Sequence, residues 1–581
     1  MYRIGKKYLQ MPYVLLAIFF LIMQVAADLS LPTITSHIIN KGIAQNNQPY
    51  IWHMGAIMLG IAFMGITGAV LNVYFAATQS QRLGMKLRHD LFHKITHMDV
   101  QNVDKFGDAT LITRTTNDVT QLQNVFQTAL RMMLMSPIML IGASIMVWNL
   151  DRNLTMVFAV ALPLLAISVF VNMAIAMPRF KKMQEKVDKI NLIFQQGLSG
   201  VRVIRAFNRD QFEIDKFAGA NKDLTHTARV VFTTTAMMFP IMQFILSATN
   251  IGIVWFGATF IGKGMMPVGN LVAFLTYATQ ILMSFMQLSM VITVVPRAQA
   301  SADRVNAVMD ERDLVHDPEK ALELPNEKPS LVFDHVEYTF PNANRPVLKD
   351  LNFTVQSGQT LAIIGGTGAG KSTFMNLIPR LIDPTKGRIL LNGVDIKQLT
   401  QHDLHAAIAI TQQKAVLFSG TVRSNLQYGK HDATEEEMNA ALVTAQSADF
   451  VAEQGGLDMT VEQNGGNFSG GQRQRLAIAR TLIKQALVYV FDDSFSALDF
   501  ATDANLRKAI NTDPRLHDSI KVIVAQRIAT VMNADLIIVL ENGQITGMGT
   551  HDELAKTNEQ YQEIMHSQLS DEDLKEVGLH A

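Results

Sequence analysis

The chain of 581 residues contains no cysteine. Disulfides, thiolate metal sites and a cysteine nucleophile are therefore excluded. Charged residues are scarce in the first half. Residues 1–300 carry 25 Lys+Arg and 13 Asp+Glu, a net of +12, whereas residues 301–581 carry 25 and 38, a net of −13. This split excludes a disordered chain and a uniform soluble globule. It predicts a membrane half followed by a soluble half.

Long apolar runs account for the low charge of the first half. A helix needs about 20 apolar residues to cross a bilayer. Six runs meet this condition, at about 13–33, 52–77, 129–149, 154–177, 232–261 and 268–295. Two connections, 78–128 and 178–231, are long and basic, and the positive-inside rule therefore places them in the cytoplasm. We expect a multi-pass protein of the plasma membrane, with its N-terminus and its second half on the cytoplasmic side.

The two long connections show helical periodicity and are predicted to extend as helices beyond the membrane. Each contains a break, at residues 103–108 and 206–212. Such a break is either an ordinary turn or a small transverse surface that contacts another domain. Asp28 is the acidic residue deep in a predicted span. Its carboxylate faces either a substrate pathway or a neighbouring helix.

A phosphate-binding loop opens the soluble half. Residues 301–329 are polar and read as a linker, and the apolar strand 361–364 then leads into a GxxxxGK[ST] loop. Backbone N–H groups of such a loop point at phosphate oxygens, its lysine reaches the β/γ-phosphates and its serine can ligate Mg²⁺. The loop consists of Gly365, Gly366, Thr367, Gly368, Ala369, Gly370, Lys371, Ser372 and Thr373.

Two further motifs fit the same chemistry. A second apolar strand, 487–491, ends in Asp492 and Asp493, and Asp492 suits an aspartate that organises Mg²⁺. Between the two strands, a short motif opens a helical run. That motif is either a second anion site or a plain N-capped helix. It consists of Ser469, Gly470, Gly471 and Gln472.

With Ser496-Ala497-Leu498-Asp499 following, this order of motifs resembles an ATP-binding-cassette (ABC) ATPase, and the whole chain resembles a half-transporter of the ABC exporter (type IV) class. The resemblance implies an all-α membrane domain over 1–300, with six transmembrane helices and long cytoplasmic extensions. An α/β P-loop cassette over 330–566 and a polar tail over 567–581 would follow. The two helix breaks would be coupling helices.

The resemblance also implies the remaining site residues and the partners. Phe340 would stack on adenine, Gln413 would be the Q-loop glutamine and a Mg²⁺ ligand beside Ser372 and Asp492, and Asp499 would be the D-loop aspartate. The cofactors would be ATP and Mg²⁺. Two half-transporters would sandwich two ATP molecules head to tail. Each site would then combine the Walker motifs of one chain with the signature of the other.

The chain departs from the family pattern at two catalytic positions. Asp493 stands where the family has a glutamate as catalytic base, so its carboxylate falls about 1.5 Å short, and proton abstraction depends on that reach. Gln526 stands where the family has the switch-loop histidine. An amide can bond a γ-phosphate but cannot carry the charge of a protonated imidazole. The chain therefore looks like the degenerate-site subunit of a heterodimeric multidrug exporter.

The leading hypothesis is a subunit of an ATP-driven exporter that moves amphipathic drugs or lipids out of the cytoplasm. Its own ATP site would be slow, and its intact signature would serve an unlike second half-transporter. The alternatives are a homodimeric lipid or peptide exporter that uses Asp493 as a weak base, and a non-pumping, nucleotide-gated regulatory subunit. No nucleic-acid partner is expected, because six spans exclude a soluble ABC protein of translation or DNA repair.

Overall fold

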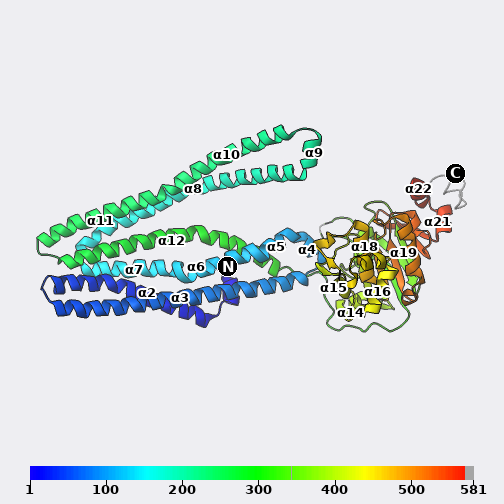
Figure 1. Cartoon of the computed structure of the whole chain (residues 1–581), viewed down its shortest axis with the longest axis horizontal. Coiled ribbons are helices and arrows are strands. Elements are labelled where there is room, and N and C mark those ends of the chain that lie inside the picture. The colour runs from blue at the N-terminus through cyan, green and yellow to red at the C-terminus, as the bar shows by residue number, and fades with distance from the viewer. Residues whose placement is uncertain (342, 569–581) are drawn as a thin grey trace. The chain divides into compact units, whose positions relative to one another are not determined.

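The computed structural model describes residues 1–341 and 343–568, with the backbone alone at 289–293. The described chain forms two compact units, one of residues 1–97 and 106–311, the other of residues 98–105 and 312 onward. Six helices among these residues are long and apolar enough to cross a membrane. The predicted fold class is confirmed: a helical membrane domain precedes an α/β cassette (Figure 1).

Helices alone build the described part of the membrane unit, and α8 and α10 run side by side as one long hairpin (Figure 1). Short π-helical turns at Ile38–Ile43, Arg114–Asp118 and Ala129–Met133 extend or join neighbouring helices. The helices are α1 (Tyr2–Tyr8), α2 (Met11–His37), α3 (Gln48–Thr96), α5 (Asp108–Thr113), α6 (Val119–Thr128), α7 (Leu134–Leu150), α8 (Arg152–Ser199), α9 (Val201–Ala206), α10 (Asp210–Ala236), α11 (Met238–Gly262) and α12 (Val268–Met309).

The predicted breaks in the long connections fall at slightly different residues. In the first, α4 (Val100–Phe106) is itself helical, and the chain breaks before it at 97–99 and after it at Gly107, which has a φ of +74°. In the second, the chain turns at 207–209, between α9 and α10. α12 continues to Met309, so the first part of the predicted linker is helical. Of the predicted tail 567–581, residues 569–581 lie outside the described residues.

The cassette has a six-stranded sheet in the order β12-β11-β3-β10-β9-β6, parallel except for β12 at its edge, and an antiparallel sheet in the order β2-β1-β4-β5. A two-stranded pair, β7 and β8, lies apart from both. The strands are β1 (Ser330–Tyr338), β2 (Leu348–Gln356), β3 (Thr360–Ile364), β4 (Lys386–Leu391), β5 (Val394–Asp395), β6 (Ile408–Thr411), β7 (Gly420–Thr421), β8 (Thr460–Val461), β9 (Val488–Asp492), β10 (Ile520–Val524), β11 (Leu536–Glu541) and β12 (Gln544–Gly549).

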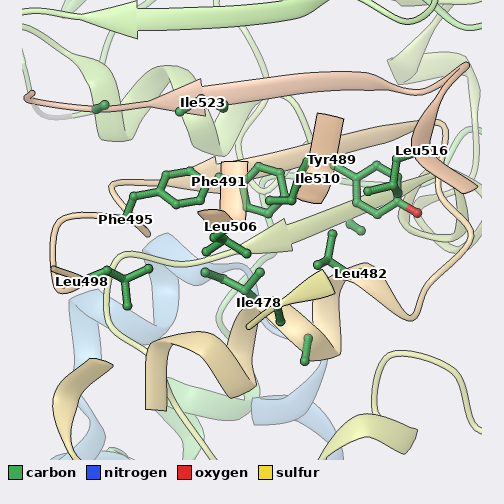
Figure 2. Close-up of a cluster of buried hydrophobic side chains, with 14 of the residues drawn as sticks. Ile478, Leu482, Tyr489, Phe491, Phe495, Leu498, Leu506, Ile510, Leu516 and Ile523 are labelled. Carbon is green, nitrogen blue, oxygen red and sulfur yellow. The ribbon is translucent and has the colours of Figure 1, made fainter. Parts of the chain in front are cut away.

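Helices cover the six-stranded sheet, whose inner strands are continuous apolar runs because both faces are buried. One core cluster packs Ile478 and Leu482 against Tyr489 and Phe491 of β9 (Figure 2). This packing holds β9, and with it the residues at its carboxyl end, in place within the cassette. The cassette helices are α13 (Lys371–Leu377), α14 (Gln401–Ala407), α15 (Val422–Gln427), α16 (Glu435–Thr444), α17 (Ala448–Glu453), α18 (Gly470–Leu482), α19 (Phe500–Thr512), α20 (Ile528–Val531), α21 (His551–Thr557) and α22 (Glu559–Gln568).

Candidate functional site

The phosphate loop joins β3 to α13, and its outer glycines are fixed by the local geometry. A Cβ on Gly365 would lie 2.1 Å from the carbonyl oxygen of Leu540, and Gly370 adopts a φ of +104°. Neither position accepts an ordinary side chain. A Cβ on Gly366 or Gly368 would meet nothing within 4 Å, although the φ of +84° at Gly368 also favours glycine. The ends of the loop are therefore packed, while its middle is open.

The open middle of the loop borders a cavity of about 410 Å³. Residues 365–369 form one wall, residues 539–542 at the β11–β12 turn form another, and α22 supplies the rest. Ser372 and Thr373 lie in the first turn of α13, directly after the loop. Five of the nine predicted loop residues thus line the cavity, and the start of α13 follows them in the chain.

Lys371 is held back against its own loop. Its Nζ donates hydrogen bonds to the carbonyl oxygens of Gly365 and Gly366, at 2.7 and 2.8 Å. Burial lowers the pKa of Lys371, and the charges of Asp493 and Asp492 oppose that effect. The ammonium of Lys371 therefore interacts electrostatically with the two carboxylates at the end of β9. It belongs to the same site as the two aspartates.

Asp492 and Asp493 meet at the carboxyl end of β9. Burial and the neighbouring charge of Asp493 raise the pKa of Asp492. Asp493 has a φ of +43°, a left-handed conformation that aspartate tolerates better than most residues. Its backbone N–H donates to the carbonyl oxygen of Val524 at 2.9 Å, so the parallel pairing with β10 continues through this residue. The left-handed backbone of Asp493 thus ends the regular strand at the residue that carries this carboxyl group.

Two amide side chains converge on the carboxyl group of Asp493. Gln526 Nε2 donates to Asp493 Oδ2 at 3.0 Å, and Gln413 Nε2 donates to the same oxygen at 3.3 Å. Burial raises the pKa of Asp493, and the hydrogen bond from Gln413 opposes this rise. The three predicted catalytic residues therefore lie together, although 80 residues separate Gln413 from Asp493.

The Ser-Gly-Gly-Gln motif forms the start of α18, as a capping box. Gln472 N donates to Ser469 Oγ at 3.3 Å, and Ser469 N donates to Gln472 Oε1 at 2.9 Å. A Cβ on Gly470 would meet nothing within 4 Å, and one on Gly471 would make ordinary contact with Ala497. Within the described cassette, no hydrogen bond joins this motif to the phosphate loop or to Asp493. The hydrogen bonds of this motif are thus those of a helix start.

Asp499 and Phe340 lie outside the cluster around Asp493. Asp499 caps α19, where its Oδ1 accepts a hydrogen bond from Thr502 N at 2.9 Å, and such hydrogen bonds lower the pKa of Asp499. The ring of Phe340 is 41% exposed and packs edge-on against Tyr338, with ring centroids 5.1 Å apart. Phe340 is accessible for stacking, and Tyr338 fixes its orientation.

The segment 98–105, which includes most of α4, packs within the cassette unit. Gln101 Nε2 donates to the hydroxyl of Tyr338, and Asn102 Nδ2 donates to the carbonyl oxygen of Arg312 at 2.9 Å. Asp99 Oδ2 accepts the backbone N–H groups of Leu314 and Val315. Gln101 thus reaches the tyrosine on which Phe340 rests. Sequence reasoning missed this connection.

Sequence reasoning also missed α22, because it identified no helix at this point and placed the end of the cassette at residue 566. This helix lines the cavity beside the phosphate loop, and Gln568 bonds the loop that carries Gln526. The buried Tyr561 and Met565, four residues apart, are the signal of an amphipathic helix that was available.

Six spanning helices joined to a cassette with these motifs define the class of ATP-driven ABC exporters. Residues 14–285 match the family model for the ABC transporter transmembrane region, and residues 348–496 match the model for ABC transporters. An uncharacterised ABC transporter ATP-binding protein of Mycobacterium tuberculosis is 38% identical over 547 residues, 93% of each chain. The chain belongs to the ABC transporter family.

One further relative and one solved structure are both proteins that transport substrates across a membrane. An ATP-dependent lipid A-core flippase of Desulfotalea psychrophila is 30% identical over 500 residues, 85% of this chain and 87% of the flippase. The structure of a bacterial Atm1-family ABC exporter with ATP bound matches with a TM-score of 0.78 and 25% identity, over 96% of this chain and 98% of that one. The chain is thus a multi-pass membrane protein with a cytoplasmic ATP-binding domain, and it couples ATP hydrolysis to transport. ABC exporters act as dimers.

Proposed function

We propose that this chain is one half of a heterodimeric exporter, in which its own ATP site is slow and its signature completes the faster site of an unlike partner. The observation that carries this proposal is the state of Asp493. Its Oδ2 accepts hydrogen bonds from Gln526 and Gln413, so the carboxyl is tied to two amides at the end of β9.

Two chemical reasons make this site slow. The carboxylate of aspartate is one methylene shorter than that of glutamate, and a misplacement of 1 Å at a reacting group can cost about 10²-fold in rate. Gln526 presents a neutral amide, which donates a hydrogen bond without the positive charge that a protonated imidazole would bring to the transition state. Burial raises the pKa of Asp493, so basicity is not what this carboxylate lacks.

The residues present suit MgATP. Mg²⁺ prefers oxygen ligands and is usually held by one or two carboxylates together with substrate phosphates. Ser372, Gln413 and Asp492 offer a hydroxyl, an amide carbonyl and a carboxylate. Such an ion would neutralise charge on the phosphate oxygens.

The remaining site residues are assigned by the same proposal. The phosphate loop would hold the phosphates, Phe340 would stack on the base, and Asp499 would lie at the junction with the partner. Ser469, Gly470, Gly471 and Gln472 would face the partner's nucleotide, because they form a capped helix start with an open glycine. The segments near 103–108 and 206–212 would transmit closure of the cassettes to the spans.

The transported substrate would be an amphipathic drug or a lipid. A second candidate, a homodimeric lipid exporter, is favoured by the relative described as a lipid A-core flippase. In that case two copies of this chain would pair, and Asp493 would serve as a weak base at both sites. The two candidates differ in the hydrolysis expected from this chain alone.

Restoring the two departures tests the slow-site proposal. We expect the purified full chain, reconstituted in lipid nanodiscs, to hydrolyse ATP very slowly, and the double variant D493E/Q526H to gain about 10²-fold. The triple variant K371A/D493E/Q526H is the control, because it should lose the gain if the activity comes from this site. Fast hydrolysis by the unaltered chain alone would overturn the proposal and favour the homodimer.

A further inference from the structure

The last helix of the described cassette grips the loop that carries Gln526. The backbone N–H of Ile528 donates to Gln568 Oε1 at 2.9 Å, and Gln568 Nε2 donates to the carbonyl oxygen of Gln526 at 2.7 Å. An amide side chain presents a donor and an acceptor side by side. A single residue of α22 therefore satisfies the backbone on both sides of Arg527.

The position of Gln568 is set by a packed helix. Tyr561 and Met565 of α22 are fully buried, in the same core cluster as Ile528 and Val531 of α20. The Tyr561 hydroxyl also lies 2.7 Å from Nδ1 of the buried His551. Because α20 begins directly after Gln526 and Arg527, α22 and the switch loop rest on one cluster. Gln568 is therefore held where the loop needs it.

The opposite side of the loop faces the catalytic edge. Gln526 Nε2 donates to Asp493 Oδ2, and Arg527 Nη2 donates to the carbonyl oxygen of Ser496 at 3.2 Å. The Arg527 guanidinium also lies 5.3 Å from the ring centroid of Phe500. Bonds on one side reach the ends of β9 and α19, and the bonds on the other side reach α22. With its backbone held on both sides, Gln526 has few directions in which to point.

We propose that Gln568 is a positioning residue for the switch loop, and that α22 thereby controls how well Gln526 reaches the γ-phosphate of bound nucleotide. The same helix lines the cavity beside the phosphate loop through Gln560, Glu563 and Ser567, so it adjoins both ends of the phosphate site. This inference rests on the proposed role of Gln526, but it holds whether the site is slow or fast and whether the partner is like or unlike.

The test measures the affinity for a nucleoside triphosphate relative to the affinity for ADP. A purely structural role of Gln568 would not change this ratio. A contact to the γ-phosphate strengthens binding of a triphosphate and leaves ADP unaffected. We expect Q568M, which keeps the size of the side chain but removes both hydrogen bonds, to weaken binding of the non-hydrolysable analogue AMP-PNP about three- to tenfold. ADP binding should change less than about twofold. The measurement is equilibrium binding to the full chain in nanodiscs, with Mg²⁺.

A matched control is available on the same helix. Gln562 Nε2 donates to the carbonyl oxygen of Ala555 at 2.8 Å, away from the switch loop, so Q562M should leave both affinities unchanged. Q568E keeps the acceptor for Ile528 N but turns a carboxylate oxygen toward the Gln526 carbonyl. It should therefore weaken AMP-PNP binding at least as much as Q568M does.

The variant Q526A separates failure of this inference from failure of the proposed function. If Q526A lowers the affinity for AMP-PNP relative to ADP and Q568M does not, the positioning role of Gln568 is wrong. Equal weakening of both nucleotides by Q568M would also overturn it, since that result reports general destabilisation. If Q526A itself leaves the ratio unchanged, the assigned role of Gln526 fails, and the inference fails with it.

Discussion

Two parts of the cassette, the start of α18 and the end of β9, differ in how their polar groups are used. At the start of α18, Ser469 and Gln472 satisfy each other in a capping box, and Gly470 faces open space. At the end of β9, Asp493 has a left-handed backbone and accepts hydrogen bonds from two amides. The first surface is a regular helix start with an open glycine. The second engages its carboxylate within the chain, so we expect the two parts to respond differently to mutation.

The largest effect is expected from a charge placed on the open signature surface. Gly470 has room for a side chain, and glutamate is favourable in the first turn of a helix, so G470E should fold normally. Its carboxylate would repel a nucleotide phosphate brought by the partner. We expect ATPase activity of the assembly purified with its natural partner to fall about 10²-fold, with an unchanged melting temperature. S469T, which keeps the capping hydroxyl, should retain most activity.

A smaller effect is expected from removing the lysine of this chain's own phosphate loop. K371A should abolish tight nucleotide binding at that loop. If this site contributes little turnover, ATPase activity of the same assembly should fall by less than about tenfold. Side-by-side assays of K371A and G470E provide the comparison. Equal losses in the two variants would mean that the two sites are equivalent, and the contrast drawn above would disappear.

The smallest effect is on stability, and it depends on pH. Burial raises the pKa of Asp493 above its ordinary value of 3.8. The carboxyl's favourable contribution is therefore complete only below about pH 3.8 and is lost as the pH rises through the folded-state pKa. Without nucleotide, D493N should raise the melting temperature at pH 7.5 by about 1–3 °C. The gain should shrink as the pH falls toward 4.

Removing the carboxylate of Asp499 should change the melting temperature in the opposite direction. Hydrogen bonds at the start of α19 lower the pKa of Asp499, so its ionised form stabilises the fold at neutral pH. D499A should therefore lower the melting temperature at pH 7.5, as measured by scanning calorimetry of the full chain. A shift in the same direction for both variants would contradict the contrast between the two carboxylates.

Motif order predicted most of the cassette, because short polar signals stand at the ends of buried strands. Asp493 and Gln526 could be paired in advance, since the ends of parallel β9 and β10 meet at one edge of a sheet. Gln568 could not be paired with them. Its partners are backbone groups 40 and 42 residues away, and the contact depends on how α22 packs on α20. Backbone acceptors leave no trace in a sequence pattern.

The same limit applies to α4. Its helical periodicity was readable, but its assignment to the cassette depends on three polar side chains that bond a tyrosine hydroxyl and backbone groups after residue 311. The carboxylate of Asp99 accepts hydrogen bonds from the backbone N–H groups of residues 314 and 315. Gly107, with its positive φ, permits the turn that follows α4. The predicted break at 103–108 missed this arrangement, because the charged residues there resemble an ordinary turn.

The position of α4 in the chain has a consequence for biosynthesis. Residues 98–105 leave the ribosome more than two hundred residues before the surface they bind exists. Asp99, Gln101 and Asn102 must therefore stay hydrated while the spans are inserted, since domains generally fold as units during synthesis. Their partners, which are the backbone of residues 312–315 and the hydroxyl of Tyr338, are synthesised only after the six spans. α4 can therefore join its unit only after the spans have been made.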